Sequence, residues 1–107
     1  MEIEWLRFRV NDSERERFVQ QDHAIWTRTL AQYPGFLGKD VLINPNDVTE
    51  VVTIIRWNSF DEWQAIPEAV LTGVEAEFSQ AMGSTYELLE SRHYQVRKFA
   101  QEHCGSI

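Results

Sequence analysis

The sequence predicts an α+β fold in which one four-stranded antiparallel sheet carries helices on one face, in the order β-α-β-β-α-β. Two strand signals support this prediction. Residues 3–10, IEWLRFRV, alternate strictly between two faces, and residues 51–55, VVTII, are apolar on both faces, as in a strand covered from two sides. A Ser-x-x-Glu string, the capping-box pattern that begins helices, follows shortly after each strand.

A first helix is expected from about residue 14 to residue 32, after a capping box formed by Ser13 and Glu16. At about 100° per residue, one stripe of side chains is expected to pack on the sheet: Phe18, Ile25, Trp26, Thr29, Leu30 and Tyr33. Asp22 lies near the middle of this stripe, where a carboxylate is costly unless it is hydrogen-bonded, paired or at the mouth of a wet pocket. His23 lies at the edge of the stripe.

Turn signals divide the middle of the chain. Residues 33–36, YPGF, place Pro second and Gly third, as in a type II turn, and end the helix. A strand follows over residues 36–43, in which Gly38 suggests a bulge or the close approach of another backbone. The loop signal NPND at residues 44–47 then predicts an antiparallel hairpin with the strand that contains residues 51–55.

The second half of the chain repeats the pattern. Ser59 and Glu62 form the second capping box, and the helix that they begin is expected to carry three apolar side chains inward: Phe60, Trp63 and Ile66. Pro67 ends that helix or begins a new one, which runs to about Met82 with apolar residues at helical spacing. A last strand over residues 85–96 is expected to have one face made of Tyr86, Leu88, Glu90, Arg92, Tyr94 and Val96.

This element order is the ferredoxin-like arrangement, in which both helices cover the same face of the sheet. The other face would be bare, although it includes Trp5 and one side of the doubly apolar strand. An exposed apolar surface of that extent is unusual for a monomer. We therefore expect a homodimer whose two sheets pack face to face. The chain is expected to form a single domain, residues 1–107, with residues from about 98 to 107 as a tail.

Composition limits the function classes. The formal net charge is −7, and between Asp40 and Glu90 there are ten acidic side chains and one basic one, Arg56, so the surface would repel nucleic acid. No apolar run approaches the roughly 20 residues of a membrane span, and the N-terminus is acidic and alternating, unlike a signal peptide. We therefore expect a cytoplasmic protein. The single cysteine, Cys104, is either an incidental thiol or the site of an intermolecular disulfide.

Several strings resemble a known superfamily, the dimeric α/β barrels, which include the antibiotic-biosynthesis monooxygenase domain and the stress-responsive barrel domain. The resemblance spans nearly the full length, and it is carried by Pro34-Gly35-Phe36 with Gly38 and by Arg56-Trp57-Asn58-Ser59 followed by Trp63. A subgroup of short cyanobacterial proteins of unassigned function is similar in three further strings: INPND (43–47), RW-S---W-AIP (56–67) and ES--YQV (90–96). The resemblance implies a ferredoxin-like dimeric α/β barrel.

Resemblance to the oxygenases of this superfamily implies a ligand pocket in each subunit, between the helices and the sheet. It also implies that no cofactor is needed, because the substrate, a phenol or similar acid, reacts with oxygen once it has lost a proton. In that case Asp22 or His23 would accept or relay the proton. Trp26 and Trp63 would wall the pocket.

The same residues also have structural interpretations. Arg56 or Arg7 would stabilise an oxyanion in an oxygenase, but each could instead form a salt bridge with a neighbouring carboxylate. The tryptophans could be core aromatics, His23 a residue at the helix edge and Asp22 a cap or ion-pair partner. Because no catalytic motif is complete, the alternative function is a non-catalytic homodimer that binds a small apolar ligand or a protein partner. An open cavity at Asp22 would favour a ligand site, and a filled core with Asp22 bonded to a strand would favour a structural role.

The haem-degrading branch of the superfamily depends on an asparagine on strand one, a tryptophan late in the helix after strand three and a further histidine that ligates iron. In an ungapped alignment those places hold Glu4, Ile66 and Ala76, so none of the three matches. Metal-ligand spacing is also absent among the histidines, which are His23, His93 and His103. The sequence therefore predicts neither haem chemistry nor a metal site.

Overall fold

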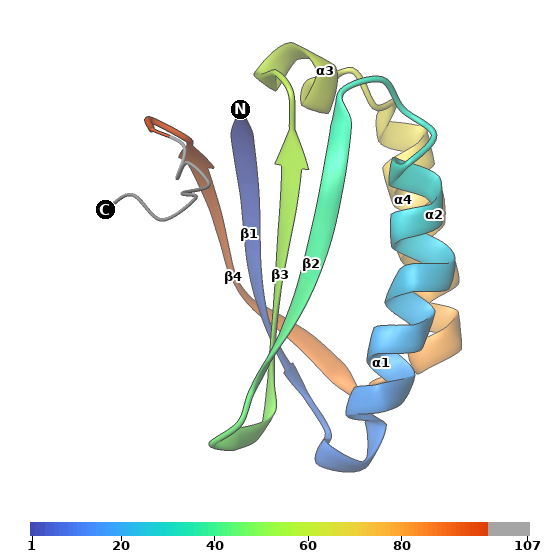
Figure 1. The fold of residues 1–107 in the computed structure, drawn as a ribbon. Helices are drawn as coiled ribbons and strands as arrows, with labels where there is room; N and C mark the ends of the chain where they lie inside the picture. Colours follow the sequence, from blue (N-terminus) through green and yellow to red (C-terminus); the bar gives the residue numbers. More distant parts are fainter. Residues whose placement is uncertain (99–107) are drawn as a thin grey trace.

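The computed structural model describes residues 1–98, which form a four-stranded antiparallel sheet with the long helical segments on one face and a short helix at one end (Figure 1). The strands are β1 (Glu2–Val10), β2 (Phe36–Asn44), β3 (Asp47–Trp57) and β4 (Tyr86–Gln95). Their order across the sheet is β2-β3-β1-β4, so β2 and β4 are the edges. This is the predicted ferredoxin-like α+β fold.

The C-terminal tail and a membrane-spanning helix were both considered from the sequence. The tail expected from about residue 98, with His103 and Cys104, falls outside the described residues except for Lys98. Within residues 1–98, no helix combines the length and the hydropathy needed to cross a membrane.

The first helical segment runs without a break but changes its winding along its length. It consists of a 3₁₀ turn η1 (Asp12–Glu14), helix α1 (Arg15–Gln21), a π-helical segment η2 (Asp22–Thr27) and helix α2 (Arg28–Leu30). The expected capping box of Ser13 and Glu16 does not form, which corrects the prediction. Instead the Asn11 carbonyl accepts a 2.8 Å hydrogen bond from the Glu14 N–H, so the helix has already begun when the chain reaches Ser13.

The second helical segment consists of α3 (Phe60–Gln64) and α4 (Glu68–Met82). The capping box predicted at its start does form, because Ser59 Oγ accepts a 3.1 Å hydrogen bond from the Glu62 N–H. Pro67 occupies the N-cap position of α4, so this proline begins a new helix.

One inward side chain predicted for α3 is placed differently. Ile66 is buried and Trp63 packs against the core, as expected. Phe60 is 45% exposed and stacks on the ring of His93, with 5.2 Å between the centroids. The reason is that α3 lies over the end of the sheet and not over its face (Figure 1).

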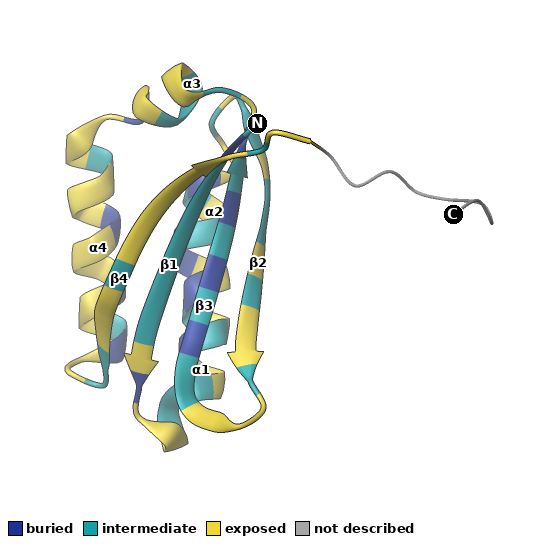
Figure 2. Ribbon diagram, turned by 90° about the vertical axis from the view of Figure 1, so that its left-hand side faces the viewer, coloured by how far each residue is buried: buried dark blue, intermediate teal, exposed yellow. Residues whose placement is uncertain are grey.

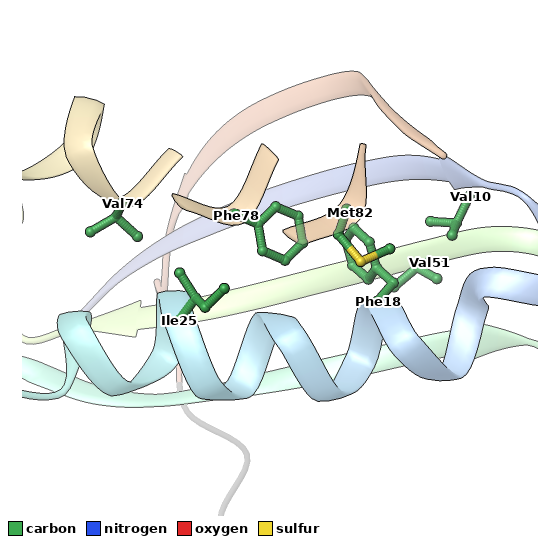
Figure 3. Packing of buried hydrophobic residues seen from close by; sticks show 7 residues of the cluster. All are labelled: Val10, Phe18, Ile25, Val51, Val74, Phe78 and Met82. Atoms are coloured by element: carbon green, nitrogen blue, oxygen red, sulfur yellow. The ribbon is translucent and has the colours of Figure 1, made fainter. Parts of the chain in front are cut away.

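Two apolar clusters fill the space between the sheet and the helices. The larger cluster contains Val10, Phe18, Ile25, Val51, Val74, Phe78 and Met82 (Figure 3). The smaller cluster contains Leu30, Ile55, Trp57 and Ile66. Along β3 the residues that face the helices are buried, whereas Val52 and Ile54, on the other face, are only half-buried. Residues 1–98 therefore cover the doubly apolar strand on one side only.

The predicted turn and bulge before β3 both form. Gly35 has a φ of 89°, and the Phe36 N–H donates a 3.3 Å hydrogen bond to the Tyr33 carbonyl, which closes the turn. Gly38 has a φ of 140° and lies where the pairing of β2 with β3 changes register. The change of register turns Lys39 toward the helices.

A bulge in β4, which was not predicted, reverses the faces of that strand. The partner in β4 moves from Leu88 to Glu90 between consecutive residues of β1, so Leu89 is the extra residue. Beyond the bulge, the face away from the helices holds Glu90, Arg92 and Tyr94. The expectation that the even-numbered residues of this strand share one face is therefore wrong, because it assumed an uninterrupted period of two.

Gly35→Ala is expected to lower the free energy of unfolding by about 1–3 kcal/mol. A Cβ at this position would lie 2.6 Å from Glu62 Cβ, and the positive φ adds strain. Gly73→Ala in α4 is the matched control: its Cβ would meet nothing within 4 Å, and we expect a neutral effect or a gain of about 0.5–1 kcal/mol. Urea unfolding measures both variants. Equal stabilities would contradict the role assigned to Gly35.

Candidate functional site

A cavity of about 300 Å³ lies between the helices and the face of the sheet that they cover, here called the inner face. Most of its wall consists of apolar and aromatic side chains: Leu6, Phe8, Phe18, Trp26, Leu30, Ile55, Phe78 and Leu88. Phe18 and Phe78 meet edge to face, with 5.3 Å between their centroids, and also belong to the larger core cluster (Figure 3). The cavity is thus a part of the core that side chains leave empty, and its size suits a small ligand.

The cavity opens between α4 and β4. Its exposed lining residues lie on these two elements and are Glu75, Leu88 and Ser91, and β4 is exposed along most of its length (Figure 2). At this rim Tyr86 Oη donates a 2.7 Å hydrogen bond to Glu75 Oε1. Burial raises the pKa of Tyr86, and the Glu75 carboxylate raises it further, so the phenol keeps its proton and remains a donor.

A buried ion pair forms the closed end of the cavity. Lys39 Nζ lies 2.8 Å from Asp22 Oδ1, and the two side chains are 3% and 4% exposed. Asp22 is the first residue of η2, and the bulge at Gly38 directs Lys39 inward from the edge strand β2. Within residues 1–98, Asp22 Oδ2 has no hydrogen-bond partner. One oxygen of the carboxylate is therefore free to accept a hydrogen bond from a ligand.

A second carboxyl group lies near this ion pair. Glu4 on β1 and Lys39 on β2 both pair with Ile55 of β3, which separates them. Burial raises the pKa of Glu4, and this effect exceeds the opposing influence of the Lys39 ammonium and the Trp57 indole N–H. One buried polar atom of the lining, Thr53 Oγ1, completes no hydrogen bond within the described part of the chain. The closed end thus combines a cation, two carboxyl groups and unused hydrogen-bonding capacity.

Of the six residues predicted for a site, Asp22 and Trp26 line the cavity. Both belong to η2, whose inward side faces the sheet. His23 follows Asp22 directly but is exposed and does not line the cavity. Adjacent helical residues point in different directions, so the structure does not bring His23 to the cavity beside Asp22.

The two predicted arginines lie on the opposite face of the sheet, here called the outer face. Arg56 Nη2 is 2.8 Å from Asp40 Oδ2. Arg7 contacts Glu90 at 3.0 Å and Glu50 at 3.7 Å. The sheet separates both arginines from the cavity, so they cannot contact a ligand there. They form the salt bridges that were their alternative interpretation.

Trp63 does not line the cavity either. It packs against the smaller core cluster and meets the ring of His93 edge to face, with 4.9 Å between the centroids. Of the positions compared with the haem-degrading branch, Glu4 lines the cavity, Ile66 is buried in the core and Ala76 is exposed on α4. Within residues 1–98, no three His, Cys, Asp or Glu side chains are arranged to hold a metal ion.

Beyond the rim residues Glu75, Tyr86 and Ser91, three polar residues deeper in the cavity were not predicted: Glu4, Lys39 and Thr53. The alternation of β1 that places Leu6 inward also places Glu4 inward, so that signal was present. The bulge suggested by Gly38 would have revealed Lys39, because a bulge exchanges the faces of the residues after it. Thr53 lies on the buried side of a strand that is apolar on both faces, and no sequence signal distinguishes that side.

Comparisons with known proteins identify the fold. No protein-family model matches the sequence, and a search of curated proteins finds no significant match. SnoaB, a cofactor-independent oxygenase from Streptomyces nogalater, matches in structure with a TM-score of 0.65 and 20% identity, over 94% of this chain and 98% of that one. A monooxygenase from the gene ActVA-Orf6 of Streptomyces coelicolor, in complex with nanaomycin D, matches with a TM-score of 0.74 and 13% identity, over 95% and 92% of the chains.

A third structural match is to a protein described as a dimer. A dimeric ferredoxin-like protein from an uncultured marine organism has a TM-score of 0.69 and 16% identity, over 92% of this chain and 97% of that one. At such identities these matches establish the fold alone. They confirm that the chain is similar in fold to the antibiotic biosynthesis monooxygenases, as predicted from the sequence.

Lys39→Met is expected to lower the free energy of unfolding by about 3–5 kcal/mol, because it leaves Asp22 buried without a counter-ion. Arg17→Met, on α1, is the matched control: its ion pair with Glu14 is more exposed and lies away from the sheet, and its loss should cost about 0–1 kcal/mol. Adding Asp22→Asn to Lys39→Met should recover most of the stability, since the buried charge is then gone. Urea unfolding compares the three proteins. A loss for Lys39→Met no larger than that of the control would refute the buried pair.

Proposed function

We propose that this protein binds a small aromatic or phenolic molecule in the cavity and oxidises it with molecular oxygen without a cofactor. The observation that carries the proposal is the closed end of the cavity, where a cation and two carboxyl groups lie beside an aromatic wall. SnoaB, a cofactor-independent oxygenase, has the same fold. The cytoplasm, expected from the sequence, is the proposed location.

Oxidation of a phenol by molecular oxygen requires few functional groups from the protein. A phenol reacts with oxygen more readily after it loses its proton, because the phenolate is richer in electrons. When one O₂ converts a phenol to a quinone, one oxygen atom stays on the ring, the other leaves as water, and the substrate supplies all the electrons. The protein needs to orient the ring, accept the proton and stabilise the phenolate.

The cavity residues correspond to these three tasks. Trp26, Phe18 and Phe78 offer flat surfaces to an aromatic ring. Asp22 and Glu4 are the carboxyl groups at the closed end that are able to take a proton. Lys39 supplies positive charge to the phenolate. Asp22 and Trp26 thus keep a place in the proposed site, and the four predicted residues that do not line the cavity have none.

A non-catalytic ligand-binding protein is the alternative, and one observation favours it. Asp22 is bonded to a residue of a strand, Lys39, as expected for a structural ion pair. The cavity nevertheless remains open at the same place, with one Asp22 oxygen unpartnered within residues 1–98. The two functions share the cavity and differ in whether the bound phenol is consumed.

Oxygen uptake with 1-naphthol and 1,5-dihydroxynaphthalene tests the oxygenase. Purified protein should accelerate the uptake measured with an oxygen electrode. Ser91→Trp narrows the rim and should reduce the rate by at least about tenfold, because the phenol must reach the cavity to be oriented. Ser84→Trp, at an exposed position outside the lining, is the matched control and should leave the rate unchanged. Naphthol binding without oxygen uptake would refute catalysis and leave the alternative.

We also propose that the outer face of the sheet packs against a second copy of this chain. Apolar side chains on this face include Ile3, Trp5, Val52, Ile54 and Tyr94. Ion pairs join its charged residues, four arginines and four carboxylates: Arg7, Arg9, Arg56 and Arg92 with Asp40, Glu50, Glu87 and Glu90. Although the chain carries a net charge of −7, this face is balanced, so two copies can meet on it without net repulsion. A protein of the same fold is dimeric.

Trp5→Glu is expected to convert the dimer to a monomer at micromolar concentration, because the introduced carboxylate would be buried at the interface. Trp5 lies on the central strand β1, with the Arg92 guanidinium 5.5 Å from its ring centroid. Leu71→Glu, on the exposed side of α4, is the matched control and should remain dimeric. Sedimentation velocity distinguishes the two. A wild-type protein that stays monomeric across the concentration range would contradict the packing.

A further inference from the structure

Two buried polar atoms of the residues that line the cavity lack a hydrogen-bond partner within residues 1–98: Asp22 Oδ2 and Thr53 Oγ1. Buried polar atoms are nearly always hydrogen-bonded in folded proteins, so each exception calls for an explanation. Asp22 and Thr53 line the cavity. A ligand that carries a hydroxyl group would satisfy them from inside it.

The strand register places two charged side chains on either side of one position. Lys39 on β2 and Glu4 on β1 both pair with Ile55 of β3. Neighbouring strands lie about 4.8 Å apart, so the two backbones are about 10 Å apart. Both side chains lie on the inner face and line the cavity, as does Ile55. A phenol oxygen above Ile55 would have Lys39 on one side and Glu4 on the other.

We infer that Glu4 accepts the proton of the bound phenol, that Lys39 holds the resulting phenolate, and that Asp22 positions Lys39 and is not the base. This inference rests on the proposed function, because it concerns the same cavity and the same class of substrate. Asp22 Oδ1 is already occupied by Lys39 Nζ at 2.8 Å. Lys39 acts on Glu4 through space, and the Trp57 indole N–H also lowers the pKa of Glu4. A carboxylate has two oxygens, so Glu4 can bind a ligand as well as the indole.

The proton transfer balances within the cavity. The O–H bond of the phenol breaks, an O–H bond forms on Glu4, and the negative charge moves to the phenolate oxygen beside Lys39. The net charge does not change. Burial raises the pKa of Glu4, which favours the protonated carboxyl that the transfer produces. The other ionisable groups that line the cavity, Glu75 and Tyr86, lie at the rim.

Nitrophenols report this transfer without oxygen chemistry, because a nitrophenolate absorbs at longer wavelength than its phenol. We expect 4-nitrophenol and 3-fluoro-4-nitrophenol, titrated without oxygen at a pH below their pKa, to bind the wild-type protein as phenolates. The infrared spectrum should gain the C=O band of a protonated carboxyl group at the same time. Incorporation of ¹³C-labelled glutamate should shift that band, which identifies the acceptor as a glutamate in the unsubstituted protein.

Three variants separate the roles. Glu4→Gln should reduce the phenolate signal by at least about tenfold and abolish the carboxyl band. Asp22→Asn should keep the carboxyl band, since Asp22 is not the acceptor, and should weaken phenolate binding by less than the removal of Lys39 does. The Asp22→Asn/Lys39→Met protein should bind the phenolate at least about tenfold more weakly. Glu2→Gln, also on the inner side of β1 but outside the cavity lining, is the matched control for Glu4→Gln.

The outcomes distinguish this inference from the proposed oxygenase. Loss of the phenolate signal in Asp22→Asn and its retention in Glu4→Gln would assign the proton to Asp22 and overturn the inference. Binding of neutral phenols only, or no binding at millimolar nitrophenol, would also overturn it. Phenolate formation that depends on Glu4, without oxygen uptake for any naphthol, would support the inference and refute the oxygenase. Circular dichroism verifies that each variant is folded.

Discussion

The buried ion pair between Asp22 and Lys39 constrains the structure around it. A carboxylate on the inward side of a helix is strongly destabilising without a counter-ion, and here the counter-ion comes from an edge strand. Simple alternation along β2 would point Lys39 to the outer face, so the pair depends on the bulge at Gly38. A buried pair is often no more stabilising than apolar side chains of the same volume. Stability alone therefore does not account for the Asp22–Lys39 pair, whereas the cavity beside it allows the pair to contact a ligand.

The two faces of the sheet differ in how their charged side chains are arranged. On the inner side Lys39 and Glu4 lie with Asp22 at one end of an apolar cavity, and the Asp22–Lys39 pair is almost completely removed from water. On the outer face arginines and carboxylates neutralise one another in pairs that remain partly exposed. Most of the excess negative charge of the chain therefore lies away from the outer face, on the helices and loops. A molecule with this distribution can self-associate through its sheet while its helical side stays acidic and well hydrated.

The sequence predicts much of the fold because many of the signals are local. Strand alternation in β1, the turn at residues 33–36 and the capping box at Ser59 each involve neighbours along the chain, and all three are present in the structure. The candidate site was predicted only in part. Helical periodicity identified Asp22 and Trp26, but Lys39 can be assigned to the inner face only once the bulge at Gly38 is recognised. The β4 bulge contains no glycine and depends on pairing with β1, far away in the sequence.

The π-helical segment η2 has a consequence for how the chain can be compared with others. An α-helix turns about 100° per residue, so Phe18 and Leu30 would point about 120° apart in a regular helix, yet both are buried. The wider π turn absorbs one residue and brings them back into phase. The segment therefore contains one residue more than a regular α-helix that spans the same distance. It lies beside the cavity. An alignment with a protein whose helix is regular needs a one-residue gap inside a secondary-structure element, where gaps are ordinarily penalised.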